Sequence, residues 1–332
     1  MTCPTQHSRP IRRIAVVGTG VIGASWATLF LARGFDVLAT DPAPNAQANL
    51  RRFIDTAWPV IAKLGLSPKA SPDHLSFTTD LRRALADADF VQESAPDDRE
   101  LKISLFAEMD KAAPADSIIA SSSAGLTMSV LQSACKHPER CVIAHPLNPP
   151  HVIPLVEVVG GAKTSPEVTQ QAMAFFASIG RKPIHIRKEI VGHVANRLQA
   201  ALYRELAYLI DQDVVDVDAA DAAVSWGPGL RWGVMGPNLL LHLGGGACGI
   251  HRFMDGVPVP MATWWKQLGN PELSSKLRQT IIDGTLQEAA DRPPEQLARE
   301  RDDVLLGLIR LRSKAAKAQG HRARNPRSRK RP

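Results

Sequence analysis

A histidine and a glutamate stand where they can act together as an acid–base pair. His145 follows the apolar run Cys141–Ala144, so it lies at the carboxyl end of a predicted strand. Glu157 interrupts a second predicted strand, Leu155–Val159. A carboxylate inside an apolar strand needs a partner, because burying it unpaired is costly. We therefore predict that Glu157 orients His145 and raises its basicity, and that His145 is a general base.

A glycine-rich segment near the amino terminus predicts a dinucleotide site. It reads Gly18-Thr19-Gly20-Val21-Ile22-Gly23. The segment follows the apolar strand Ile14–Val17 and precedes a helix predicted over residues 21–33. Gly18 permits a tight turn, Gly20 lets the backbone approach a pyrophosphate, and Gly23 lets helix and strand pack closely.

An acid at the end of the next predicted strand, Val37–Thr40, selects the cofactor. Asp41 can accept hydrogen bonds from ribose hydroxyls, and its charge repels a 2′-phosphate. Pro42 follows, with no arginine beside it to hold that phosphate. The amides of Val21 and Ile22 belong to the helix N-terminus, where the helix dipole favours phosphate. We therefore predict NAD, not NADP.

Strands that alternate with helices predict the fold. Further short strands are expected at Phe90–Gln92, Ser117–Ala120, Cys141–Ala144, Leu155–Val159 and Ile184–Ile186. Helical patterns such as residues 99–112 separate them. This order is typical of an α/β Rossmann-type fold with a mostly parallel sheet, whose strand carboxyl ends face the ligand crevice.

The period of the sequence changes after the last predicted strand. Apolar residues from Ile190 to Leu209 predict a helix with one wide apolar face, and helical patterns follow it. We predict an NAD-binding Rossmann domain at residues 1–188, a helical substrate and dimerisation domain at 189–313, and a basic disordered tail at 314–332. The apolar helix face favours a homodimer.

The charge is unevenly distributed. The net charge is +7, but residues 314–332 hold eight Lys or Arg and no acid, so the rest of the chain is near neutral. The tail has no aromatic residue, which favours a solvated end over a nucleic-acid site. No apolar run is long enough to cross a membrane, and the start has no signal core, so a cytoplasmic location is expected.

Cysteine and histidine spacings do not predict a metal site. The four cysteines, Cys3, Cys135, Cys141 and Cys248, are expected to be reduced thiols because no two have a paired spacing. His145 and His151 lack a third ligand at suitable spacing.

Five sequence segments occur together in order. They are the glycine segment 18–23, Gln92-Glu93-Ser94-Ala95-Pro96-Asp97 with Leu101-Lys102, His145-Pro146-Leu147-Asn148-Pro149-Pro150, Pro154-Leu155-Val156-Glu157-Val158-Val159, and Gly192-His193-Val194-Ala195-Asn196-Arg197. With these segments the chain resembles the L-3-hydroxyacyl-CoA dehydrogenase superfamily over residues 12 to about 313. The resemblance implies that Asn196 holds the substrate oxygen and that Asp97 and Lys102 contact the nicotinamide half of the cofactor.

One departure from the family pattern concerns the substrate oxygen. The serine-rich turn reads Ser121-Ser122-Ser123-Ala124-Gly125-Leu126. Ala124 occupies the place at which the resemblance puts a substrate-contacting serine. Either Ser123 substitutes for that serine, or Asn196 and His145 suffice.

Two substrate classes compete within the superfamily. The segment between Asp41 and Asp80 is short and poor in lysine, which disfavours the CoA-dependent enzymes of fatty acid metabolism. The segment 229–237 resembles the branch of lambda-crystallin and carnitine dehydrogenase, which implies a free 3-hydroxy acid such as L-gulonate or L-carnitine. Arg231 is then the candidate clamp for the substrate carboxylate, and Asn148 a further substrate contact.

Some features of that branch stay open. Leu147 and His151 stand where the carnitine enzymes tend to carry aromatic residues, which disfavours carnitine. We expect the clustered tryptophans to pack in the core, with a face for a quaternary ammonium as the alternative; they are Trp226, Trp232, Trp264 and Trp265. A non-catalytic, crystallin-like NAD-binding protein is the rival from another class.

Overall fold

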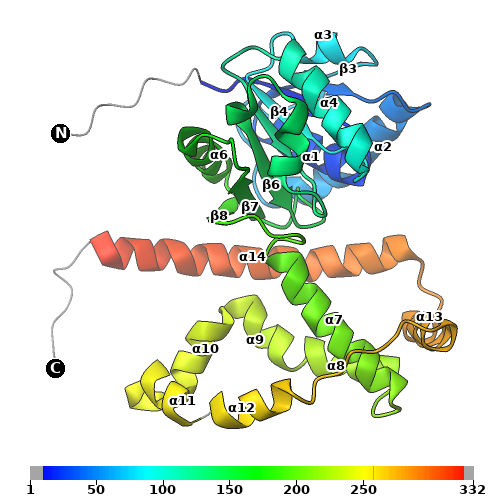
Figure 1. Ribbon diagram of the computed structural model, residues 1–332, viewed down its shortest axis with the longest axis vertical. Coiled ribbons are helices and arrows are strands. Elements are labelled where there is room, and N and C mark those ends of the chain that lie inside the picture. Colours follow the sequence, from blue (N-terminus) through cyan, green and yellow to red (C-terminus); the bar gives the residue numbers. More distant parts are fainter. Residues whose placement is uncertain (1–9, 257, 325–332) are drawn as a thin grey trace. The chain divides into compact units, whose positions relative to one another are not determined.

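Eight short segments in the first part of the chain pair into one sheet, with the strand order β3-β2-β1-β4-β5-β6-β7-β8 (Figure 1). The strands are β1 (Arg13–Val17), β2 (Asp36–Thr40), β3 (Leu75–Thr78), β4 (Phe90–Glu93), β5 (Ile118–Ser121), β6 (Cys141–Pro146), β7 (Leu155–Gly160) and β8 (Lys182–His185). Strands β1 to β6 are parallel, whereas β7 pairs antiparallel with β6 and parallel with β8. The predicted α/β class with a mostly parallel sheet is confirmed.

Strand β3 was missed in the sequence. It lies at an edge of the sheet, and of its four residues only Leu75 is buried. An edge strand with polar Ser76 and Thr78 carries too short an apolar pattern to be recognised.

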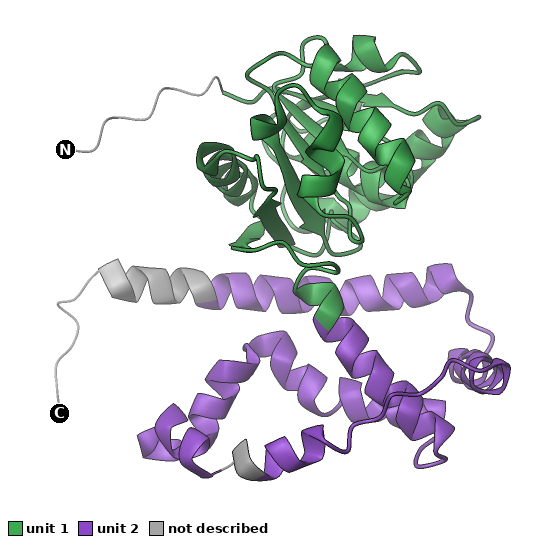
Figure 2. Ribbon diagram, in the orientation of Figure 1, with its two compact units in different colours: residues 1–197 green, residues 198–332 purple. Residues whose placement is uncertain are grey.

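The computed structural model describes residues 10–256 and 258–324. Two compact units divide the chain after Arg197, as Figure 2 shows. The sequence predicted a boundary near residue 188. The intervening segment belongs to the first unit because it is hydrogen-bonded there: Glu189 Oε1 accepts the amide of Ser129 at 2.8 Å, for example.

Helices cover both faces of the sheet in the first unit (Figure 1). Along β1, Ile14 and Val16 pack into one apolar cluster, whereas Ala15 and Val17 pack into the other. The first cluster includes residues of α1 (Val21–Ala32), α2 (Ala46–Ala62) and α6 (Pro166–Ser178), and the second those of α3 (Leu81–Leu85), α4 (Arg99–Ala112) and α5 (Met128–Leu131). A strand buried on both faces explains the continuous apolar runs in the sequence.

Aromatic side chains fix α1 against the sheet. Trp26 stacks on Phe30 within α1, with ring centroids 5.5 Å apart, and also contacts Phe176 of α6 at 5.4 Å. Phe90 of β4 contacts Phe175 of α6 at 4.5 Å. These contacts hold α1 beside the central strands. The N-terminus of α1, at which the glycine loop ends, is therefore fixed in position.

The glycine loop joins β1 to α1 as predicted. Gly18 has a φ of +86°, and a Cβ there would lie 2.7 Å from the amide nitrogen of Ala95. A Cβ on Gly23 would lie 1.9 Å from the carbonyl oxygen of Gly18. A Cβ on Gly20, in contrast, would meet no described atom within 4 Å. Two glycines are therefore required by packing, and the third leaves open space at the N-terminus of α1.

The regular secondary structure of the second unit, within its described residues, is helical, as predicted. The helices are α7 (Ala195–Asp211), which begins in the first unit, α8 (Val217–Ser225), α9 (Pro228–Val234), α10 (Pro237–Gly244), α11 (Ile250–Gly256), α12 (Pro258–Trp265), α13 (Ser275–Ala289) and α14 (Pro294–Arg324). The predicted helix from Ile190 begins only at Ala195, because Gly192 and His193 have left-handed φ values of +76° and +48°.

Two other predictions for this unit differ from the structure. Helix α14 continues past residue 314 to Arg324, although we predicted a disordered tail there; Lys, Ala, Gln and Arg are all good helix formers. Residues 325–332 lie outside the described residues. The clustered tryptophans are exposed and not in the core, with exposed fractions of 80% for Trp226 and 62% for Trp265.

No helix within the described ranges is both long enough and apolar enough to span a membrane.

The contrast between Gly23 and Gly20 predicts two different defects. Gly23→Ala should lower the melting temperature and weaken NAD binding, because its Cβ would collide with the backbone of Gly18. Gly20→Ala should leave the melting temperature unchanged and weaken NAD binding by about tenfold, since it fills only the open space. Calorimetry and NADH fluorescence titration measure both properties. Gly244→Ala, also with no described atom within 4 Å, is the control; equal defects in Gly20→Ala and Gly23→Ala would contradict this account.

Candidate active site

The two residues predicted to form an acid–base pair lie side by side. In the antiparallel register of β6 and β7, His145 is directly opposite Glu157. The Nδ1 atom of His145 lies 2.9 Å from Oε2 of Glu157. Both side chains are buried. Opposite positions on neighbouring strands place both side chains on one face of the sheet, which is why two residues distant in sequence can meet.

The second carboxylate oxygen of Glu157 is held by backbone. Oε1 accepts hydrogen bonds from the amides of Val194 and Ala195, each at 2.9 Å. Burial raises the pKa of Glu157, but the hydrogen bonds from His145 and from the two amides outweigh burial, so its pKa is below the ordinary value. Glu157 is therefore a carboxylate near neutral pH.

The ionised Glu157 fixes the tautomer of His145. A carboxylate can only accept hydrogen bonds, so the neutral imidazole carries its proton on Nδ1. The Nε2 atom then presents a lone pair. The imidazole thus has a set orientation, as a general base requires, and its role as the base stays a prediction.

The serine-rich turn follows β5 and is tied to Asp97. The carboxylate oxygen Oδ2 of Asp97 accepts the amides of Ala124 and Gly125, each at 3.1 Å. Burial raises the pKa of Asp97, but hydrogen bonds from the Ser123 side chain and from the turn backbone, together with the charge of Lys102, lower it overall. The Ser123 side chain also accepts the amide of Leu126 at 3.1 Å. Its hydroxyl is thus engaged within the turn.

A buried ion pair between Lys102 and Glu93 supports this turn. Lys102 was among the site residues predicted from the sequence, and Glu93 was not. Lys102 is fully buried, and its Nζ donates to Oε1 of Glu93 at 2.7 Å. Glu93 Oε2 accepts the hydroxyl of Ser121 at 2.5 Å, and Oε1 accepts the amide of Ala95 at 2.6 Å. Lys102 also lies 3.5 Å from Asp97. A direct contact of Lys102 or Asp97 with the cofactor stays a prediction.

Two residues near the site, Glu93 and His193, were missed in the sequence, and only Glu93 had a signal there. Glu93 ends an apolar strand nine residues before Lys102. A carboxylate in an apolar strand needs a partner, and this argument had identified Glu157. His193 lies inside the recognised segment 192–197, but its sequence neighbours say nothing of its partner, the carbonyl oxygen of Ser123, 70 residues away.

The glycine loop and α1 fit a dinucleotide. Among the described residues no side chain caps the N-terminus of α1, so the first-turn amides are available to a pyrophosphate. Asp41 Oδ2 accepts the amide of Thr19 at 2.7 Å and its hydroxyl at 3.1 Å. Asp41 is half-buried, and these hydrogen bonds hold the loop; its contact with the ribose stays a prediction.

The structure places the remaining predicted residues in different parts of the chain. Asn196 is half-buried in the first turn of α7, one residue beyond the amide that binds Glu157. Asn148 is exposed in the loop after β6. Arg231 is exposed on α9 in the second unit. No group of three or more His, Cys, Asp or Glu within the described ranges could hold a metal ion.

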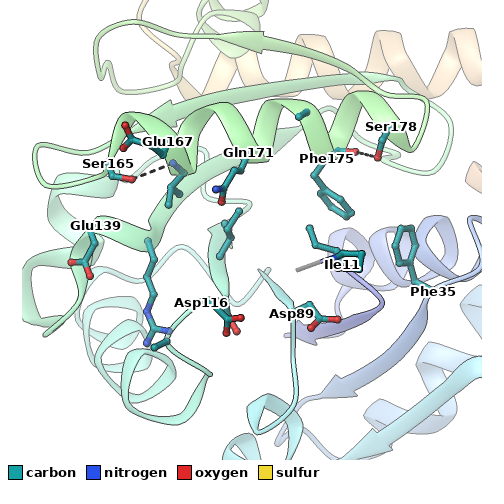
Figure 3. Close-up of a pocket in the computed structure, with 17 residues that line it drawn as sticks. Ile11, Phe35, Asp89, Asp116, Glu139, Ser165, Glu167, Gln171, Phe175 and Ser178 are labelled. Atoms are coloured by element: carbon teal, nitrogen blue, oxygen red, sulfur yellow. Dashed lines mark hydrogen bonds between the residues drawn. The ribbon is translucent and has the colours of Figure 1, made fainter. Parts of the chain in front are cut away.

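A cavity of about 720 Å³ lies away from this chemistry (Figure 3). Ile11, Phe35 and Asp89 line it from segments that precede β1, β2 and β4, and Phe175 lines it from α6. These positions are the amino ends of the strands, whereas His145 is at the carboxyl end of β6. Ligands of open parallel sheets bind outside the carboxyl ends, so we do not assign the substrate to this cavity.

The buried pair predicts a large loss of stability on removal of one partner. Lys102→Met leaves the Glu93 carboxylate buried without a cation, which should lower the free energy of unfolding by about 3–5 kcal/mol. Urea denaturation measures this change. Lys111→Met, an exposed lysine on the same helix α4, is the control. If both variants unfold at the same urea concentration, the pair has no such role.

Comparison with known proteins shows which family the chain belongs to. Residues 13–190 match the 3-hydroxyacyl-CoA dehydrogenase NAD binding domain, and residues 192–283 match the C-terminal domain of the same family. A protein of Bacillus cereus named L-carnitine dehydrogenase is 44% identical over 304 residues, which cover 92% of this chain and 93% of that protein. A Streptomyces griseus protein of the same name is 44% identical over 95% of this chain and 94% of its own.

A solved structure resembles both units. It is the crystal structure of 5-formyl-3-hydroxy-2-methylpyridine 4-carboxylic acid 5-dehydrogenase, described as an NAD⁺ dependent dismutase. It is 30% identical, has a TM-score of 0.79, and the match covers 92% of this chain and 99% of that chain. The chain therefore belongs to the 3-hydroxyacyl-CoA dehydrogenase family and is an NAD-dependent dehydrogenase that acts on a CH–OH group.

Proposed function

We propose that this enzyme oxidises the 3-hydroxyl group of L-carnitine, a free 3-hydroxy acid, and that His145 is its general base. The observation that carries the chemistry is the buried His145–Glu157 pair at 2.9 Å. The similarity to proteins named L-carnitine dehydrogenase, at 41–44% identity over at least 90% of this chain, supports the substrate.

Leu147 and His151, which disfavoured carnitine in the sequence, are weaker evidence against it once their surroundings are known. His151 is buried, and its Nδ1 lies 2.7 Å from the hydroxyl of Ser25 on α1. A side chain occupied in packing α1 says little about the substrate. Leu147 is half-buried. The similarity to L-carnitine dehydrogenases therefore outweighs the absence of aromatic residues at positions 147 and 151.

The proton of the substrate hydroxyl passes to Nε2 of His145 in this proposal. Glu157 stays ionised and stabilises the imidazolium that forms, as the acid of a Ser-His-Asp triad does. When bound, NAD supplies the hydride acceptor at C4 of its nicotinamide ring. In the reverse direction His145 returns the proton to the oxygen of the 3-keto compound.

Asn196 is the better candidate to hold the substrate oxygen. Of the two alternatives for the missing serine at position 124, substitution by Ser123 is disfavoured, because its hydroxyl oxygen already accepts the amide of Leu126. Asn196 and His145 then share this task, and the amide group of Asn196 donates to the oxygen.

The principal test replaces the base and screens substrates. His145→Ala should lower kcat by about 10²–10⁴-fold while NADH still binds. The screen measures NAD reduction with L-carnitine, L-gulonate, 3-hydroxybutyrate and 3-hydroxybutyryl-CoA, and L-carnitine should give the highest kcat/KM. His185→Ala, on exposed strand β8, is the control.

The outcomes separate the rival functions. A preference for the CoA ester would replace our substrate with an acyl-CoA. Absence of turnover with every substrate would favour a non-catalytic, crystallin-like protein. Undiminished turnover in His145→Ala would remove the proposed base.

Arg231 is proposed as the clamp for the substrate carboxylate, with Asn148 as a further contact. Arg231→Met should raise KM for L-carnitine by about tenfold or more, equivalent to ~1.4 kcal/mol, and change kcat little. Steady-state kinetics measure this split. Arg252→Met, an exposed arginine on α11 of the same unit, is the control, and an unchanged KM in Arg231→Met would exclude the clamp.

We also propose that the second unit pairs with a second copy of this chain. Among its described residues, the apolar cluster has five buried members, Ala207, Ile210, Val217, Ala220 and Leu277. Large apolar side chains on α9 to α14 are exposed, among them Leu239, Leu243, Trp264, Leu286 and Val304. Such extensive apolar exposure is typical of an interface. Light scattering at micromolar concentration should give the mass of a dimer; a monomer would exclude it.

A further inference from the structure

A second histidine lies beside the proposed base and has no role in the chemistry described so far. The rings of His193 and His145 have their centroids 5.0 Å apart and are tilted by 44°. His193 is buried. It belongs to the segment between β8 and α7, which is hydrogen-bonded both to the turn after the carboxyl end of β5 and to Glu157 near the amino end of β7.

The hydrogen bond of His193 defines its tautomer. Its Nε2 lies 2.9 Å from the carbonyl oxygen of Ser123. A carbonyl only accepts, so Nε2 carries the proton. Burial lowers the pKa of His193, and the neighbouring His145 lowers it too, whereas the bond to Ser123 and the charges of Glu157 and Asp97 act in the opposite direction. The net lowering keeps the ring neutral, with Nδ1 as a bare acceptor.

Two unfavourable features are concentrated at His193. Its Nδ1 is buried and has no hydrogen-bond partner among the described residues. Its φ of +48° is in the left-handed region, which a residue with a Cβ rarely adopts. A phenylalanine would fill similar space without the unsatisfied acceptor. The Nε2–H donor is therefore what a histidine adds at this position.

The backbone on either side of His193 joins two parts of the site. On one side, Gly192 donates its amide to the carbonyl oxygen of Ala124 at 3.2 Å. On the other side, the amides of Val194 and Ala195 hold Glu157. Gly192 and His193 have left-handed φ values, and this turn lies between the amide that binds Ala124 and the two amides that bind Glu157.

We propose that His193 is a positioning residue for His145. Its Nε2–H bond to Ser123 anchors residues 192–195 to the serine-rich turn, so that Val194 and Ala195 grip Glu157 and thereby set the orientation of His145. The ring of His193 packs beside that of His145 and limits its rotation. This inference rests on the proposed role of His145 as the base.

The test compares two substitutions. His193→Phe keeps a ring of similar size and removes the donor; His193→Gln keeps an N–H donor at the Nε2 position. His193→Phe should lower kcat by about tenfold to a hundredfold and leave the KM of the substrate and the Kd of NADH within about threefold. His193→Gln should retain kcat within about threefold of the wild type.

Hydrogen–deuterium exchange provides a readout that needs no turnover. In His193→Phe the amides of Val194 and Ala195 should exchange faster, while β1 should exchange as in the wild type. His193→Gln should keep their protection. His185→Phe and His185→Gln, at the exposed histidine of β8, are the matched controls and should change neither kcat nor exchange.

Three results would overturn the proposal. They are wild-type kcat and protection in His193→Phe, faster exchange throughout the first unit in place of the local effect, and a folded His193→Gln that is as impaired as His193→Phe. If His193→Phe does not fold, the activity of His193→Gln decides. A wild-type enzyme inactive on L-carnitine would instead contradict the proposed substrate, and an active His145→Ala the proposed base; neither changes the exchange comparison.

Discussion

The carboxylate of Glu157 is the constraint on which the catalytic arrangement depends. It is fully buried, and an isolated charge there would be costly. Three donors compensate for the lost water, two of them backbone amides and the third the imidazole of His145. Because one oxygen is saturated by the amides of residues 194 and 195, the other is left to the imidazole alone. The hydrogen bonds that stabilise this one charge therefore also set the orientation of the His145 imidazole.

A second buried carboxylate in the sheet is also stabilised by several hydrogen-bond donors. Glu93 ends β4 as a fully buried carboxylate, and its donors are Lys102, Ser121 and the amide of Ala95. This network fixes the turn after β5, to which the segment before α7 is hydrogen-bonded. The two buried carboxylates thus hold opposite ends of one connected set of loops, along the edge of the sheet at which parallel strands present their ligands.

Local patterns in the sequence were sufficient for part of this arrangement. The glycine loop could be predicted because a Cβ at Gly18 or Gly23 would collide with nearby backbone atoms. The pairing of His145 with Glu157 could be predicted because a charge in an apolar strand demands a partner. The role of His193 could not, since it depends on a positive φ and on a carbonyl far along the chain. The start of α7 was misplaced for the same reason: apolar spacing continues through a turn that only φ values reveal.

We infer that Glu157 holds the proton of neutral His145 on Nδ1 and leaves a lone pair on Nε2. Nitrogen-15 NMR of selectively histidine-labelled protein distinguishes the two ring nitrogens by their chemical shifts and couplings. At a pH where the imidazole is neutral, we expect a protonated Nδ1 and an unprotonated Nε2 for His145. A proton on Nε2 in the neutral enzyme would contradict it.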